Sequence, residues 1–131
     1  MHQLVSELES SGYQRVEQRS SAGFGDELIA FAREALSVRL VRDRGQWFVE
    51  ASPVGGEDWF DADVWHSALT ETVPPSEPRS SEEQARLMRD DLPAISARVV
   101  ASAAPAVEQL RMIRAARSRR RLGLETEDGG G

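Results

Sequence analysis

The segment from Leu36 to Ser52, LSVRLVRDRGQWFVEAS, constrains the fold of this chain more than any other stretch. Its two halves are rich in Val, Leu, Trp and Phe, which favour strands, and apolar side chains recur in them with a period of two. The polar turn Asp43-Arg44-Gly45 separates the halves. This pattern predicts a β-hairpin with one apolar face, and we expect the rest of the fold to build on an antiparallel sheet.

Two more segments have the pattern of strands. Glu27 to Arg33, ELIAFAR, has the length of a strand, although its Ala and Glu residues leave a helix as the competing interpretation. Tyr13 to Gln18 alternates weakly, which suits an edge strand, and Ser20 to Gly25 has the composition of a turn. We therefore expect an antiparallel meander of three to four strands, and its apolar face needs helices to cover it.

Helical spacing marks the segments that would cover this sheet. Residues 2–11 predict a short helix that ends at Gly12. Asp61 is a good N-cap for a second helix. The apolar stripe of that helix consists of Val64, Trp65, Ala68 and Leu69. Three prolines between residues 70 and 79 exclude regular structure there.

The last helical region starts after this Pro-rich connector. Ser80 and Ser81 stand at capping-box spacing from an acid and an amide, and apolar residues then keep helical phase over residues 85–99. We expect Pro93 to kink this helix and Pro105 to open another one in its first turn.

These elements together predict one α+β domain. It spans residues 1–124, with an N-terminal helix and C-terminal helices covering the sheet and residues 70–79 as a connector. Residues 125–131 are acidic and end in Gly, which predicts a disordered tail.

The residue inventory excludes several kinds of site. The 131-residue chain contains no Cys, which rules out disulfides, thiol catalysis and thiolate metal ligands. No nucleophile elbow and no phosphate-binding loop occurs, so we expect a protein without catalytic activity or a cofactor. No apolar run approaches the roughly 18 to 20 residues of a membrane span, so we expect a cytoplasmic protein.

Charge is distributed unevenly along the chain. All 16 basic residues are Arg, and the formal net charge is −6. Residues 1–110 carry 10 Arg against 19 acids, whereas residues 111–121 carry six Arg and no acid. An acidic body favours basic partners through electrostatic steering and repels nucleic acid.

The segment EDWFDADVWH, residues 57–66, concentrates acids and aromatic residues beside the predicted helix start. Exposed aromatics supply contact area and acids select a basic partner, so one interpretation is a docking patch. The predicted partner-binding residues are Glu57, Asp58, Trp59, Asp61 and Asp63. The competing interpretation buries the aromatics in the core and uses the acids to cap a helix.

Two further sets of residues suggest a specific function, and each also has a simpler structural interpretation. Asp61, Asp63 and His66 could form a metal or acid–base set. The helix cap explains both acids, and no second His cluster supports such a set, so we expect no metal.

The possible nucleic-acid-binding residues are Arg111, Arg114, Arg117, Arg119, Arg120 and Arg121. The simpler interpretation places these Arg side chains in solvent or folds them back over the acidic body, because no aromatic residue interleaves them.

Three segments carry a resemblance to a known group of proteins: Phe24-Gly25-Asp26, VRLVRDRGQWF from Val38 to Phe48, and Trp59-Phe60-Asp61. Together they resemble small actinobacterial immunity proteins found beside polymorphic toxins. The resemblance covers roughly residues 24 to 69 and implies an α/β body with trailing helices. It assigns no contact residue, because the matched residues are ones that build the fold.

The expected function is therefore a non-catalytic protein-binding module. Its most concrete form is an immunity protein that neutralises a cognate basic toxin by covering the toxin's active site. The alternative is a nucleic-acid-binding or regulatory adaptor that uses the Arg-rich C-terminal helix, although the acidic body disfavours nucleic acid as a partner.

Overall fold

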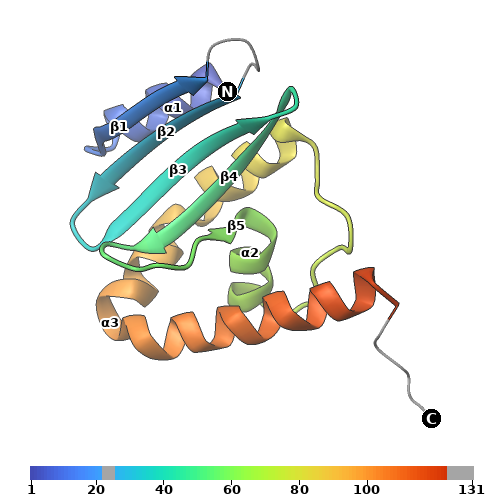
Figure 1. The fold of residues 1–131 in the computed structure, drawn as a ribbon. Helices are drawn as coiled ribbons and strands as arrows, with labels where there is room; N and C mark the ends of the chain where they lie inside the picture. Colours follow the sequence, from blue (N-terminus) through green and yellow to red (C-terminus); the bar gives the residue numbers. More distant parts are fainter. Residues whose placement is uncertain (22–25, 124–131) are drawn as a thin grey trace.

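The fold is an α+β arrangement around one antiparallel sheet, as the sequence predicts. The computed structural model describes residues 1–21 and 26–123. Its elements are α1 (His2–Ser10), β1 (Gln14–Ser21), β2 (Asp26–Arg33), β3 (Leu36–Asp43), β4 (Gln46–Pro53), β5 (Phe60–Asp61), α2 (Ala62–Thr70) and α3 (Ser81–Arg121). The sheet has five strands in the order β1-β2-β3-β4-β5 (Figure 1), one more than the upper limit predicted.

The predicted hairpin is confirmed as β3 and β4. Arg44 and Gly45 form its two-residue turn, with φ values of 54° and 83°. Positive φ at both positions is the mark of a type I′ turn, whose twist matches that of the flanking strands. Asp43 belongs to the strand and pairs with Gln46, so the turn is shorter than the sequence suggests.

The other predicted strands are also present. Glu27 to Arg33 lies in β2, which settles the choice between strand and helix. The expected edge strand is β1, which begins at Gln14 rather than Tyr13 and continues through Arg19 to Ser21, so the predicted turn is wrong at Ser20 and Ser21. The rest of the predicted turn, residues 22–25, lies outside the described residues, as does the predicted tail at 125–131.

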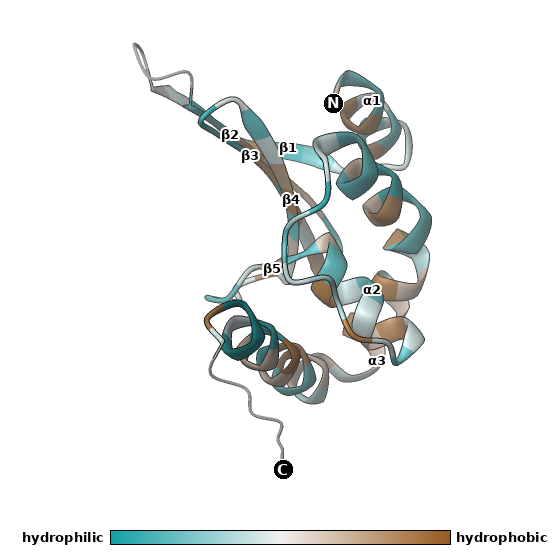
Figure 2. Ribbon diagram, turned by 90° about the vertical axis from the view of Figure 1, so that its right-hand side faces the viewer, coloured by the Kyte–Doolittle hydropathy of each residue, from teal (hydrophilic) through white to brown (hydrophobic). Residues whose placement is uncertain are grey.

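Helices cover one face of the sheet. Figure 2 shows α1 and the first part of α3 on the same side of the strands. Side chains with no exposed surface point to this side from the central strands, including Leu36, Val38 and Leu40 of β3. They form one core with Leu8 of α1 and Met88 of α3.

Asp61 links the sheet to α2. Its carboxylate Oδ1 accepts a 2.9 Å hydrogen bond from the Val64 N–H, so the predicted N-cap is confirmed. Trp65 donates from Nε1 to the Ala51 carbonyl oxygen at 3.0 Å and ties α2 to β4. Trp65 and Phe60 are fully buried and meet edge to face, which confirms that these two aromatics belong to the core.

The long helix α3 begins with a capping box and contains a break. Ser80 and Glu83 exchange hydrogen bonds at its start, as the sequence predicts. The break lies at Ser102, whose φ and ψ are non-helical, whereas Pro93 keeps helical dihedral angles. Pro105 then falls in the first turn of the following part, as expected.

We call residues 103–121 the C-terminal segment of α3. Figure 1 shows that it turns away from the first part of the helix and passes below α2. Although α3 is long, no described helix is apolar enough over its length to cross a membrane.

Candidate functional site

The acidic segment after β4 and the C-terminal segment of α3 contact each other. Asp58 accepts hydrogen bonds from Arg111 Nε at 2.7 Å and from Arg114 Nη2 at 3.2 Å. Arg117 binds both carboxylate oxygens of Asp61, at 3.2 and 2.6 Å. Two residue sets that the sequence suggests as separate binding sites are therefore bonded to each other.

Most of the Arg-rich helix end is used in this way. Positions 111, 114, 117 and 120 are three residues apart and share one helix face. Arg120 and Arg121 donate to the carbonyl oxygens of Pro74 and Ser76 in the connector, at 2.7 and 2.8 Å. Arg119 is exposed and forms no hydrogen bond or ion pair within the described part of the chain. The interpretation that this helix end folds back over the acidic body is confirmed.

Ion pairs with Arg side chains hold the acids of this region in place. Hydrogen bonds from Arg111 and Arg114 hold the pKa of Asp58 below its ordinary value. Asp63 has only 4% of its surface exposed, and Arg79 binds its carboxylate. The same bond raises the pKa of Arg79. A buried carboxylate requires such a partner, so Asp63 has a structural role.

Of the five predicted partner-binding residues, the three Asp side chains are engaged inside the fold. Glu57 is exposed, and Trp59 is half-buried beside it. Whether any of the five contacts a partner remains a prediction, but Glu57 and Trp59 are the two whose side chains form no ion pair with an Arg among the described residues.

His66 and the neighbouring acids face different partners. His66 Nδ1 lies 2.8 Å from Asp91 Oδ2 of α3, while Asp61 and Asp63 bind Arg117 and Arg79. Among the described residues, no group of three or more His, Asp or Glu side chains could hold a metal ion.

The face of the sheet opposite the helices carries a row of apolar side chains. Cross-strand pairing places Leu28 beside Val41, and Val41 beside Phe48. All three are half-buried, and no helix in the described structure covers strands β1 to β3 on this side (Figure 2). We call this side the uncovered face.

An Arg and a Trp extend the apolar row. Arg39 points to the same face, because its neighbours Val38 and Leu40 point into the core. Its guanidinium carbon lies 4.5 Å from the centroid of the Trp59 ring, and its Nε donates to Glu50 at 2.6 Å. Stacking and ion pairing hold the Arg39 side chain in place. The uncovered face therefore combines apolar residues with a fixed aromatic–Arg pair, and Trp and Arg are residue types enriched in binding hot spots.

The edge of the sheet at β4 is closed by hydrogen bonds. Beyond the two-residue strand β5, Trp47 N–H donates to Ser81 Oγ and Val49 N–H donates to Gln84 Oε1, both at 3.0 Å. Gln84 is 2% exposed and also donates to the Arg79 carbonyl oxygen at 2.8 Å. The sequence analysis does not predict this role. The signal for it is the spacing, because Gln84 lies four residues before Met88 and therefore on the same buried helix face.

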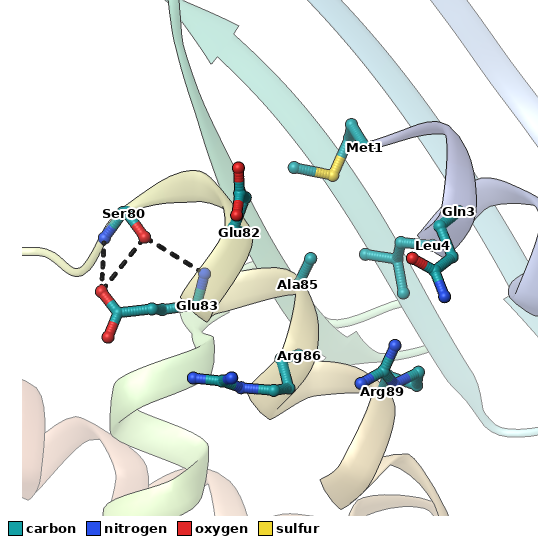
Figure 3. Close-up of a pocket in the computed structure, with 9 residues that line it drawn as sticks. All are labelled: Met1, Gln3, Leu4, Ser80, Glu82, Glu83, Ala85, Arg86 and Arg89. Atoms are coloured by element: carbon teal, nitrogen blue, oxygen red, sulfur yellow. Dashed lines mark hydrogen bonds between the residues drawn. The ribbon is translucent and has the colours of Figure 1, made fainter.

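A groove of about 460 Å³ separates α1 from the start of α3 (Figure 3). Several of its polar side chains already have structural partners. The Ser80 hydroxyl and backbone N–H bind Glu83 and lower its pKa, and Arg89 pairs with Glu7 at 3.5 Å. The capping box alone explains the position of Glu83, so this groove offers less for function than the uncovered face.

The chain matches no protein-family model, no curated protein and no solved structure.

Proposed function

We propose that this protein is a non-catalytic protein-binding module and that it docks through the uncovered face of its sheet. The observation that carries the proposal is the row Leu28, Val41 and Phe48 next to the Arg39–Trp59 stack, on a side where no helix of the described structure covers strands β1 to β3. Aromatic and Arg side chains dominate binding energy at protein interfaces, and a rigid sheet presents them in a fixed geometry.

The partner we propose is a basic toxin that the protein neutralises by occlusion, as an immunity protein does. Two observations support this class. The sequence resembles actinobacterial immunity proteins, and the formal net charge of −6 favours encounter with a basic surface.

The acidic segment has a narrower part in this proposal than the sequence suggests. Asp58, Asp61 and Asp63 stabilise the fold through Arg side chains. Trp59 belongs to the proposed surface through its contact with Arg39, and the exposed Glu57 lies two residues before it in the chain.

The nucleic-acid alternative has less support. Five of the six Arg residues at positions 111–121 donate to carboxylates or carbonyl oxygens of the protein itself. Binding to phosphates would compete with these bonds and would leave Asp58 and Asp61 without their partners.

The test is co-purification with the product of the neighbouring gene, combined with rescue of cells that express that product. Val41→Arg places a charge in the middle of the apolar row and is expected to weaken binding by about tenfold or more. Val100→Arg is the matched control, because Val100 is 65% exposed on α3.

The wild type and Val100→Arg should bind and protect, whereas Val41→Arg should do neither. Unchanged binding by a folded Val41→Arg variant would refute the proposed surface. Absence of binding and of rescue by the wild type would refute the proposed function.

A further inference from the structure

The edge of the sheet at β1 is open. Residues 14–20 are all exposed, and β1 pairs with β2 on one side only within the described structure. A bulge between Arg15 and Glu17 interrupts the ladder, and the strand is regular from Glu17 onward. Backbone groups on the outer side of this regular part are available to another strand.

Opposite charges alternate on this edge. Glu17 and Arg19 pair with Ala30 and Leu28 of β2, so both point to the uncovered face, one on each side of Gln18. Within the chain they form a 2.7 Å ion pair, which keeps the two side chains close together on that face.

This pattern suits a second copy of the same strand. If two β1 strands pair antiparallel about a two-fold axis at Gln18, each Glu17 lies opposite the Arg19 of the other copy, and opposite charges in this position stabilise a sheet. An axis at Glu17 would instead oppose like charges, and an axis at Val16 would fall in the bulge. Of these three registers, the charges favour the one centred on Gln18.

We propose that the protein forms a homodimer through β1, in the register centred on Gln18. The two five-stranded sheets then become one continuous sheet with both uncovered faces on the same side. This inference goes beyond the proposed function and does not depend on it, since it needs no toxin.

Sedimentation equilibrium across a wide concentration range tests the dimer. The wild-type mass should rise from 14.5 kDa toward twice that value. Glu17→Arg and Arg19→Glu each create like-charge pairs across the axis, so each should weaken association by about tenfold or more, and the double variant should restore it. Glu108→Arg, an exposed change on α3, controls for net charge and should have no effect.

A cross-link tests the register. The chain has no Cys, so a Gln18→Cys variant can form only an intermolecular disulfide. In this register two copies of position 18 lie opposite each other, whereas a Ser20→Cys control on the same strand lies too far from its own copy. Rapid dimer formation by the first variant alone is expected.

Three results would overturn the proposal. They are a monomeric wild type at every concentration, a dimer that survives both single charge reversals, and equal cross-linking at positions 18 and 20. A wild type that stays monomeric but binds a strand of another protein at its β1 edge would also overturn the proposal.

Discussion

The two edges of the sheet are treated in opposite ways. At β4, the short strand β5, the Ser81 hydroxyl and the Gln84 amide bind backbone groups that would otherwise be free. At β1, seven consecutive residues are exposed, and a bulge and charged side chains modify the edge. At the closed edge, backbone groups of β4 are bonded to other parts of the chain. At the open edge, the outward backbone groups of β1 are available to another strand.

This difference explains where function should be sought. The connector, α2 and the C-terminal segment of α3 gather beside the closed edge, and the acids after β4 meet the Arg residues of α3 there (Figure 1). Those charges hold the elements together. The uncovered face and the β1 edge are the surfaces that we propose for partners.

The largest expected effect is that of Gln84→Leu at the closed edge. Leu leaves the Val49 N–H and the Arg79 carbonyl without their partner in the interior, so the free energy of unfolding should fall by about 3 kcal/mol. Urea unfolding measures this change. Gln3→Leu, at an exposed position of α1, should change it by less than about 0.5 kcal/mol. Equal effects of the two substitutions would show that the closed edge contributes little.

A smaller effect is expected from Arg117→Ala. It removes two bonds to Asp61, which is also the N-cap of α2, and should lower the free energy of unfolding by about 2 kcal/mol. Arg119→Ala is the control on the same helix end and should be neutral, because its side chain is exposed and forms no hydrogen bond among the described residues. Equal free energies of unfolding for the two variants would show that the Arg row does not hold α2 and the C-terminal segment of α3 together.

The smallest effect is the pH dependence of Asp58. Its pKa is lowered in the folded state, so its contribution to stability is complete above its unfolded pKa of about 4 and is lost as the pH falls through the lower folded value. The stability difference between wild type and Asp58→Asn should therefore shrink between about pH 6 and pH 3. A difference that stays constant across this range would contradict the pairing with Arg111 and Arg114.

Much of the fold is predictable from local patterns. The hairpin follows from period-two alternation and a Gly at a position that needs positive φ, and the starts of α2 and α3 follow from Asp61 and Ser80 as caps. Two features escape such reasoning. The strand β5 has only two residues, too few for a pattern, and the break at Ser102 depends on how the C-terminal segment docks.

The candidate site is less predictable, because it depends on which charges meet in space. The acids after β4 and the Arg row are separated by about fifty residues, and each set alone has the composition of a binding patch. The Arg39–Trp59 stack and the row at Val41 depend on strand register, which local patterns predict only in part.

Residue-resolved amide hydrogen exchange compares the two edges most directly. At low protein concentration, the amides of Trp47 and Val49 should exchange only on global unfolding, while the outward amides of residues 17–20 should exchange rapidly and become protected as the concentration rises. Rapid exchange at Trp47 and Val49, or protection of β1 that equals that of β4 at low concentration, would contradict the distinction between a closed and an open edge.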